Sequence, residues 1–254
     1  MNEVQAAHDL GKAVATGVRV VLALNSGSSS FKFGLYRVQA ASSNASGIET
    51  LLSDSIDATR AQDAIAGIPD QLAKAGLPLP TAIGHRVVHG GPTLRQHCII
   101  DDAVLLQLET ATPLAPSHTP AALAIIRAAQ QLFPGLPQAA CFDTVFHAGM
   151  PDVARVLPIP AALQTEGIQR YGFHGLSYES IVQQLGSDLP TRIIIAHLGN
   201  GASITAVRGG QSVDTSMGLT PSGGIIMGSR SGDLDPGVMA YLAREKNLDR
   251  KSTL

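Results

Sequence analysis

Short apolar runs separated by small polar clusters open the chain. Val18–Leu24 is rich in β-branched residues, and Phe31–Tyr36 alternates apolar and polar positions with a period of two. Between them lies Asn25–Ser30, which holds one glycine and four serines. Runs of this kind are typical of a strand, a turn and a second strand. We therefore expect a hairpin over these residues.

The middle of the chain alternates between strand patterns and helix patterns. Short apolar runs bounded by polar residues indicate strands, whereas longer amphipathic stretches indicate helices. Pro113 and Pro116 interrupt the longest helical stretch, because proline cannot continue a helix. The alternation predicts an α/β fold. The expected elements are strands over 48–52, 81–88 and 139–142, a helix over 57–75, and broken helical segments over 101–133.

The opening pattern returns after residue 191. A strand over 193–196, a polar turn at His197–Gly201 and a strand over 202–207 repeat the order of the first hairpin. A third strand over 211–215 and a helix that begins near Pro236 complete a weak repeat of three strands and one helix. Chance likeness is the alternative, because apolar runs joined by turns are common.

The repeat predicts two α/β domains, one over 18–142 and one over 143–254, with residues 1–17 as a disordered extension. The second copy reaches its helix and then ends in a polar stretch. We therefore expect this domain to be partial, truncated relative to the first. Three strands with one helix would leave an apolar face partly uncovered.

The composition excludes several classes of protein. The 254 residues carry 18 basic and 20 acidic side chains, a formal net charge of −2, and 4% aromatic residues. This balance gives no argument for nucleic acid or a membrane as a partner, and no apolar run reaches the roughly 20 residues that span a bilayer. Cys98 and Cys141 stand far apart, which fits a reducing cytoplasm better than a disulfide framework.

The two polar turns are candidate phosphate sites. In an extended segment Ser28, Ser30 and Lys32 share one face, where hydroxyls and an ammonium group could meet a phosphate. The segment is not a Walker A loop, and an ordinary hairpin turn explains it equally well. The glycines of His197–Gly201 would let a phosphate approach the backbone, although Asn-Gly is also a common hairpin turn. Two such turns fit a phosphate clamped between two domains.

Arg86 stands out because it interrupts an apolar run. An arginine in such a strand needs a partner, either a structural carboxylate or an anionic substrate, and the sequence leaves both open. His85 and His89 have a spacing of four residues. A strand context separates such a pair, so we do not expect a zinc site.

Three further polar residues are candidates for a site. Asp143 ends a predicted buried strand, a position from which carboxylates of α/β proteins often reach a ligand, although it could equally cap a turn. His174 lies between two glycines, and Arg230 lies in a Gly/Ser loop. A structural histidine and a solvated arginine are the alternatives.

Six segments, taken together, resemble successive signatures of the acetate kinase (acetokinase) family. The resemblance runs from about Val18 to Ala243, in family order and with similar spacing. A sugar kinase of the same superfold is less favoured, because Arg86 followed by His89-Gly90-Gly91 suits a carboxylate better than a polyol. The six segments are Asn25–Lys32, Gly84–Gly91, Phe142–His147, Tyr171–Gly175, His197–Gly201 and Met227–Arg230.

The resemblance implies a fold and a reaction. The fold would be a pair of duplicated actin-like (ribonuclease H-like) α/β domains with substrates in the cleft between them. The reaction would be reversible, direct in-line phosphoryl transfer from ATP to acetate, with Mg²⁺ as cofactor and acetyl phosphate and ADP as products. The family also implies a homodimer, which is doubtful if the second domain is truncated.

The resemblance also implies roles for individual residues. Asn25 would lie on the Mg²⁺ side of the site. Arg86 would bind the substrate carboxylate, and Val88, Phe173 and Pro221 would line its apolar pocket. The expected catalytic residues are Asp143, His174, Arg230 and His118, and the expected ATP contacts are Lys32, Ser28, Ser30, His197, Leu198, Gly199, Asn200 and Gly201.

The chain departs from the family pattern in two places. Ser117 and Thr119 stand where the family usually has Leu and Asn, so the pocket is expected to be roomier and propionate to be accepted unusually well. Family members also continue well past Leu254. The alternative to an active carboxylate kinase is therefore a catalytically silent fragment that binds anions or a partner without turnover.

Overall fold

The computed structural model describes residues 18–27, 30–39 and 47–246, which form two compact units. The first unit comprises residues up to Val145 together with Gln183–Gly186, and the second comprises Phe146–Val182 and the residues from Ser187 onward. Ser28 and the extension over 1–17 lie outside the described residues. The predicted division at 142/143 stays a prediction.

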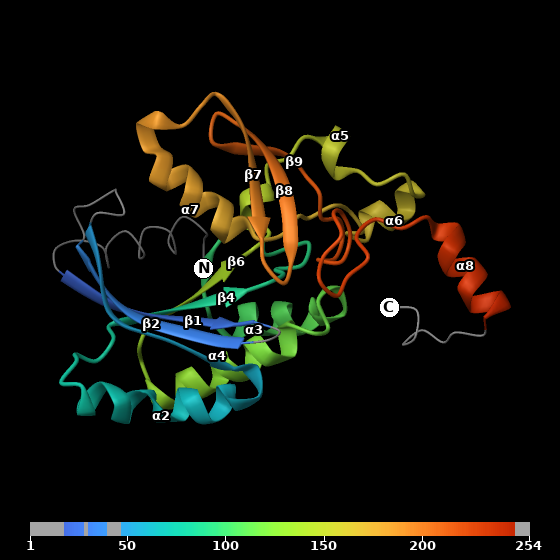
Figure 1. The fold of residues 1–254 in the computed structure, drawn as a ribbon. Coiled ribbons are helices and arrows are strands. Elements are labelled where there is room, and N and C mark those ends of the chain that lie inside the picture. The colour runs from blue at the N-terminus through green and yellow to red at the C-terminus, as the bar shows by residue number, and fades with distance from the viewer. Residues whose placement is uncertain (1–17, 28–29, 40–46, 247–254) are drawn as a thin grey trace. The chain divides into compact units, whose positions relative to one another are not determined.

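The described part of the first unit is built on a six-stranded sheet with the order β3-β2-β1-β4-β6-β5 (Figure 1). Strands β1, β2 and β3 form an antiparallel meander, whereas β1, β4 and β6 run parallel and β5 pairs antiparallel with β6. The strands are β1 (Val18–Ser26), β2 (Ser30–Gln39), β3 (Ile48–Asp57), β4 (Ala82–Val87), β5 (Cys98–Ile99) and β6 (Gln138–Phe142).

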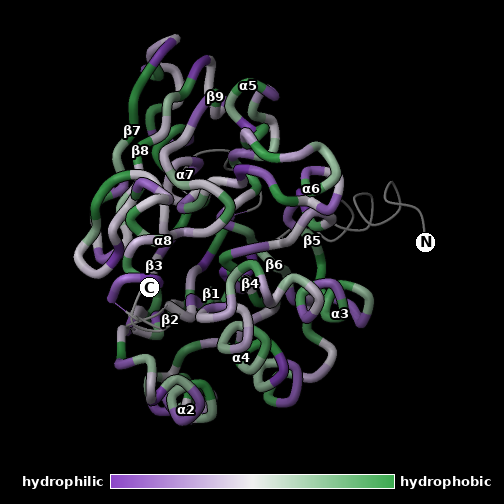
Figure 2. Tube along the Cα trace, turned by 90° about the vertical axis from the view of Figure 1, so that its right-hand side faces the viewer, coloured by the Kyte–Doolittle hydropathy of each residue, from purple (hydrophilic) through white to green (hydrophobic). Residues whose placement is uncertain are grey.

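Helices cover one face of this sheet. Figure 2 shows α2 (Ala61–Lys74), α3 (Asp102–Thr110) and α4 (Thr119–Leu132) along the same side of the strands. Alternate residues of β1 and β2 point to that side because side chains on a strand have a period of two. The resulting core holds Leu22, Leu24, Phe31, Phe33 and Leu35 together with Ile65, Ile68 and Leu72 of α2 and Ile125 of α4.

The opposite face carries a row of polar side chains. Asn25 of β1 pairs with Lys32 of β2 on one side and with Arg86 of β4 on the other, and Arg86 pairs with Cys141 of β6. Paired residues on adjacent strands point to the same side of a sheet. The four side chains therefore form one line across four strands.

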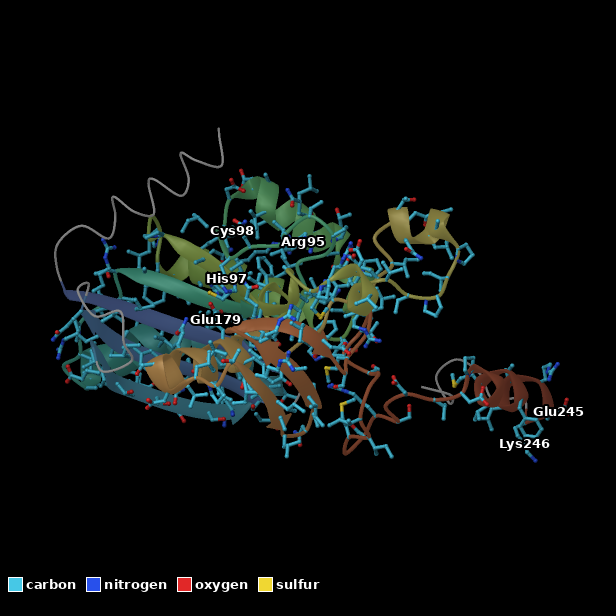
Figure 3. The ribbon with its side chains drawn as sticks, turned by 90° about the horizontal axis from the view of Figure 1, so that it is seen from above. Arg95, His97, Cys98, Glu179, Glu245 and Lys246 are labelled. Carbon is cyan, nitrogen blue, oxygen red and sulfur yellow. The ribbon has the colours of Figure 1, made fainter. Side chains whose placement is uncertain are left out.

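Strand β5 forms one edge of this sheet and pairs with β6. His97 and Cys98 lie at this edge (Figure 3), where the backbone N–H of Phe142 donates to Nδ1 of His97 over 3.1 Å. Burial, together with the neighbouring Asp101 and Cys141, raises the pKa of the Cys98 thiol to about 11. Cys98 is thus an unreactive, protonated thiol near neutral pH.

The second unit contains a three-stranded antiparallel sheet in the order β7-β8-β9. Its core is formed by Tyr178, Ile195 and Val207, against which Phe146 and Ile181 pack. On β7, Ile194 and Leu198 are 73% and 74% exposed, so the sheet has apolar side chains that nothing among the described residues covers. The strands are β7 (Arg192–Leu198), β8 (Ala202–Arg208) and β9 (Gln211–Thr215).

Most expected elements are confirmed. The helical stretch is broken near Pro113 and Pro116 as predicted, with the short helix η3 (Thr112–Leu114) between α3 and α4. The predicted turn over 197–201 is wrong in its first two residues, because β7 continues through Leu198. Elements that the pattern did not predict are β5, α5 (Asp152–Arg155), α6 (Ala161–Thr165) and α7 (Gly175–Leu185), whereas α8 (Pro236–Glu245) was expected.

No helix in the described ranges is long and apolar enough to cross a membrane. The longest, α2 and α4, have 14 residues each and pack against the sheet of the first unit.

Candidate active site

Arg86, Asp143 and Asn25 form a hydrogen-bonded cluster in the first unit. Nε of Arg86 donates to Oδ1 and Oδ2 of Asp143 over 3.0 and 3.2 Å, and Nη2 donates to Oδ2 over 2.5 Å. Nη1 donates to Oδ1 of Asn25 over 3.0 Å. The structural carboxylate that the sequence left as one alternative for Arg86 is therefore Asp143.

The sheet explains why these three residues meet. Asn25 and Arg86 occupy paired positions near the carboxyl ends of β1 and β4, and Asp143 follows the last residue of β6. The backbone N–H of Asp143 donates to the carbonyl of Val87 over 3.0 Å and so continues the pairing of the parallel strands. The carboxyl ends of neighbouring parallel strands are the usual place for ligand sites in α/β sheets.

The cluster is charged and largely buried. Asp143 is 1% exposed, whereas a quarter of the Arg86 side chain remains accessible. Burial alone would lower the pKa of Arg86, but the charge of Asp143 and its hydrogen bonds outweigh burial, so this pKa is raised above its usual value. Arg86 thus stays a cation with a fixed orientation.

Two N–H groups of Arg86 remain available. A guanidinium has five N–H donors. Asp143 accepts from Nε and from one N–H of Nη2, and Asn25 accepts from one N–H of Nη1. One N–H of Nη1 and one of Nη2 therefore have no acceptor among the described residues. Two such donors on one planar group are the pattern that binds a carboxylate.

The described residues do not by themselves form a magnesium site. They contain no group of three or more His, Cys, Asp or Glu side chains able to hold a metal ion. The oxygens of Asn25 and Asp143 both accept hydrogen bonds from the cation Arg86, which would repel a second cation at the same atoms.

The first polar turn keeps its hairpin geometry. The backbone N–H of Gly27 donates to the carbonyl of Ser30 over 2.9 Å, and a Cβ at Gly27 would lie 2.9 Å from that oxygen. Lys32 is exposed on the face that also carries Asn25, while Ser30 is half-buried. Ser28 cannot be placed, because it lies outside the described residues.

Other residues of the first unit near these strands have structural contacts. His85 is buried and its Nε2 lies 2.7 Å from Oε1 of Gln138. Burial lowers the pKa of His85 to about 4, although the Gln138 contact opposes this, so the ring is neutral. Nδ1 of the buried His89 accepts from the N–H of Gly91 over 2.8 Å. Both rings therefore have hydrogen-bonding contacts within the first unit, and the expectation that this pair holds no zinc stays a prediction.

The other predicted pocket and catalytic residues of the first unit differ in exposure. Val88 is buried, and His118 is half-buried immediately before α4, where its N–H donates to the carbonyl of Ala115 over 3.0 Å. Ser117 is exposed, whereas Thr119 is buried.

His174 is the centre of a second cluster, in the second unit. Its backbone has φ +61°, a conformation that residues other than glycine seldom adopt and that is often found at functional sites. Nδ1 of His174 lies 2.9 Å from Oγ of Ser203, and the ring stacks on His197 with centroids 4.1 Å apart. Nδ1 of His197 lies 3.0 Å from Oγ of Ser177.

Arg230 meets His174 at the turn between β7 and β8. A Cβ at Gly201 would lie 3.1 Å from both Nη1 of Arg230 and Nε2 of His174. The absence of a side chain at Gly201 is therefore what lets the two nitrogen-bearing groups face the turn backbone. Nη1 of Arg230 also donates to the carbonyl of Pro221 over 2.8 Å.

The remaining predicted residues of the second unit have mixed positions. Phe173 is fully buried and its carbonyl lies 3.0 Å from Nε2 of His147, and Pro221 is buried with its carbonyl on Arg230. Leu198 at the end of β7 and Gly199 and Asn200 of the following turn are exposed.

Sequence reasoning missed three supporting residues. His147, Ser203 and Tyr178 are buried and hydrogen-bonded within the second unit. His147 stands inside one of the family-like segments, which was a usable signal. Ser203 and Tyr178 look like ordinary strand and helix residues, so only their contacts reveal them.

Comparison with known proteins decides the family. Residues 20–253 match the acetokinase family. The chain belongs to the acetokinase family. It is 44% identical over 250 residues to an acetate kinase of Deinococcus radiodurans, covering 89% of this chain and 63% of the relative. It is 55% identical over 170 residues to an acetate kinase of Shewanella amazonensis, covering 65% of this chain and 43% of the relative.

Solved structures that match this chain show the same α/β fold. A propionate kinase from Francisella tularensis matches with a TM-score of 0.78 and 36% identity, covering 92% of this chain and 66% of that one. The Porphyromonas gingivalis acetate kinase matches with a TM-score of 0.74 and 33% identity over the same shares. The chain thus spans less than two thirds of the length of the curated relatives named above.

Proposed function

We propose that this chain transfers the γ-phosphoryl group of ATP to a short-chain carboxylate, forming acetyl phosphate from acetate. The observation that carries the proposal is the fixed guanidinium of Arg86, which offers two N–H groups beyond those engaged by Asp143 and Asn25. A carboxylate or a phosphate fits such a pair of donors, and the carboxylate is the ligand proposed for Arg86. Membership of the acetokinase family supports the reaction.

Electrostatics is the main difficulty of this reaction. Acetate is already an anionic nucleophile, so no base has to remove a proton from it, but it must approach a polyanionic phosphate. Arg86 would bind the carboxylate, and Arg230 with His174 would stabilise charge on the transferring phosphoryl group. Asp143 acts in this scheme by holding Arg86 rather than by taking a proton.

The nucleotide side rests on the two turns. Lys32, Ser30 and the segment 197–201 would contact the phosphates of ATP, and His118 would lie near the transferring group. ATP would bind as its Mg²⁺ complex, in which the ion offsets phosphate charge. Asn25 would lie on that side of the site without coordinating the ion, because its side-chain oxygen accepts from Arg86. The described residues contain no group of three or more His, Cys, Asp or Glu side chains that would hold the ion without the nucleotide.

The proposed transfer is direct and in line, without a phosphoenzyme. Neither Asp143 nor His174 has to form a covalent intermediate, since the carboxylate itself is the nucleophile. Chiral γ-phosphate would then be transferred with inversion of configuration. Retention would contradict the direct route and indicate two successive displacements.

Propionate is proposed as a second substrate. Ser117 is exposed and smaller than the leucine usual in the family, so it would leave room for one more methylene. The structural relative from Francisella tularensis is a propionate kinase.

The free cysteines Cys98 and Cys141 support a proposed cytoplasmic location. Dimerisation stays a prediction.

The test is formation of acyl phosphate, trapped as the hydroxamate, with Mg-ATP and acetate or propionate. Arg230→Ala and Arg86→Ala variants made in parallel reveal any contaminating host kinase. We expect hydroxamate from the unaltered chain and a loss of ~10³-fold in the Arg230→Ala variant, as for other arginines on transferring phosphoryl groups. Activity equal in all three preparations would contradict the proposal.

Ligand binding, measured together with turnover, distinguishes an active kinase from the catalytically silent alternative. A silent chain would be stabilised by Mg-ATP without forming hydroxamate. Ligand at 100 times its Kd adds ~2.7 kcal/mol to the free energy of unfolding, which a thermal shift detects. A thermal shift without turnover would favour the silent alternative. The absence of both a shift and turnover would contradict nucleotide binding by this chain.

A further inference from the structure

Tyr178 and Ser203 form a buried hydroxyl chain that ends on His174. The phenol oxygen of Tyr178 lies 2.5 Å from Oγ of Ser203, which lies 2.9 Å from Nδ1 of His174. Tyr178 and Ser203 are both 0% exposed, so water does not compete for these hydrogen bonds. All three residues belong to the second unit.

The acceptors along this chain fix the direction of its protons. The buried O–H of Tyr178 must donate, and among the described residues its acceptor is Oγ of Ser203. The hydroxyl proton of Ser203 is then directed to Nδ1 of His174. Nδ1 acts as an acceptor, and the neutral ring carries its proton on Nε2.

The opposite direction leaves a buried donor unsatisfied. If Nδ1 carried the proton and donated to Ser203, the serine could either donate to the phenol oxygen or accept from the phenol as well. In the first case the O–H of Tyr178, and in the second the O–H of Ser203, would have no acceptor among the described residues. A buried unsatisfied donor of this kind shifts the balance by ~5- to 150-fold toward the other tautomer.

In this tautomer the proton on Nε2 of His174 lies near Gly201 and Arg230. A Cβ at Gly201 would lie 3.1 Å from Nε2, the same distance as from Nη1 of Arg230. A neutral Nε2–H beside the Arg230 cation offers a second donor without adding a second positive charge. Two donors that converge on one glycine suit an oxygen of a phosphoryl group.

The ring of His174 has little freedom to escape this arrangement. It stacks on His197 with an angle of 22° between the rings. His197 is itself held by Ser177, at the start of the helix that carries Tyr178. A rotated ring would lose the stacking and the contact of Nδ1 with Ser203 together.

We propose that Tyr178 and Ser203 are positioning residues that hold neutral His174 in the Nε2–H tautomer, as a donor toward the transferring phosphoryl group. The tautomer follows from the contacts of the second unit alone. Its use in catalysis rests on the proposed phosphoryl transfer. The two parts are tested by separate measurements.

The tautomer is measured by long-range ¹H–¹⁵N NMR on the full chain labelled in histidine, at a pH where His174 is neutral. A His174→Gln variant assigns the signals, which otherwise overlap with those of the other histidines. We expect a non-protonated Nδ1 and a protonated Nε2 in the unaltered chain. A protonated Nδ1 in the neutral ring would overturn the proposal.

Three variants test the source of the preference. Tyr178→Phe keeps the ring but removes the donor, and Ser203→Ala removes the partner of Nδ1. Tyr171→Phe is the matched control, because it removes another buried phenol whose hydroxyl donates to the Gly167 carbonyl over 2.8 Å. We expect the Nδ1–H tautomer to appear in the first two variants only, with the ratio shifted by ~5-fold or more. Unchanged ratios in both would overturn the proposal.

Catalysis gives an independent readout. We expect Tyr178→Phe to lower kcat for acyl phosphate formation by ~10-fold or more while the KM for acetate stays within about twofold, because carboxylate binding is assigned to Arg86. An altered tautomer with no activity in any preparation would contradict the proposed function and leave the tautomer assignment standing. Full activity in a Tyr178→Phe variant with an altered tautomer would show that catalysis does not depend on the Nε2–H tautomer of His174.

Discussion

Asn25 and Arg86 lie at paired positions on the parallel strands β1 and β4, and Nη1 of Arg86 donates to Oδ1 of Asn25 over 3.0 Å. The pairing places both side chains on the face opposite α2 and α4. Asn25 therefore fixes one side of the guanidinium while Asp143 fixes the other. An asparagine near the end of β1 thus helps to orient a cation on a neighbouring strand.

Removing the charge of Arg86 should be costly. Arg86→Gln leaves the carboxylate of Asp143 buried without its cation, and breaking a buried ion pair costs ~3–5 kcal/mol of the free energy of unfolding. Because a quarter of the Arg86 side chain is accessible, we expect a loss near the lower end, measured by urea denaturation. Arg37→Gln is the control, since its pair with Glu49 is exposed and should cost less than ~1 kcal/mol.

A double variant checks the origin of this loss. Arg86→Gln combined with Asp143→Asn removes both charges, so we expect it to be more stable than Arg86→Gln alone. If the loss in the double variant equalled the sum of the losses in the two single variants, the two side chains would not interact.

Gly201 and its neighbour Gly199 separate an effect on the site from an effect on the fold. Gly201→Ala would bring a methyl group to 3.1 Å from Arg230 and His174, whereas the nearest atom to a Cβ at Gly199 is at 3.5 Å. We expect Gly201→Ala to lower the rate of phosphoryl transfer by ~10²-fold, as loss of an oxyanion donor does, and Gly199→Ala to change it little. The free energy of unfolding should change by no more than ~1 kcal/mol in either variant. Equal rates in the two variants would contradict the assigned geometry.

Gly172 should be intolerant of any side chain. Its φ is +72°, and a Cβ would lie 2.6 Å from both the ring of His147 and Cγ2 of Thr215. We expect Gly172→Ala to cost ~3 kcal/mol in urea denaturation, from backbone strain together with overpacking. Gly209→Ala, at φ +55° with no atom within 4 Å, should show only the ~1–2 kcal/mol of strain. Similar losses at both positions would mean that the contact with His147 is unimportant.

The strands and the broken helix were predictable because each follows a simple period. β1 and β2 alternate, and proline interrupts the helical stretch where the pattern indicates. Helix α7 is hard to predict although Tyr178, Ile181 and Val182 have helical spacing, because Gly172 and Gly175 lie just before and at its start and glycine is typical of loops. β5 has two residues, too few to show any period.

The partners of candidate residues were less predictable than the residues themselves. Arg86 was identified as a residue in need of a partner, but nothing local to it indicates Asp143, 57 positions away. Ser203 and Tyr178 were invisible for the same reason, since their importance lies in contacts made across the fold. Periodicity describes faces of single elements, whereas a site depends on which elements pair.

Ser117 offers a test of substrate size. Ser117→Leu should lower the ratio of kcat/KM for propionate to that for acetate by ~10-fold, because one methylene in an apolar pocket is worth about this discrimination. Ser117→Thr adds little volume and should leave the ratio nearly unchanged. A ratio unaffected by leucine would mean that this exposed side chain does not limit the pocket.

His85 should make the fold sensitive to acid. Burial lowers the pKa of His85 to about 4, below the usual 6.5, so the unfolded chain binds a proton in a range where the folded chain does not. Stability is therefore lost as the pH falls from about 6.5 to about 4, by about 3 kcal/mol from this residue. His85→Gln cannot take up a proton but keeps an amide able to reach Gln138. We expect urea denaturation to show a smaller acid loss in this variant than in the unaltered chain; parallel pH profiles would mean that His85 is protonated equally in both states.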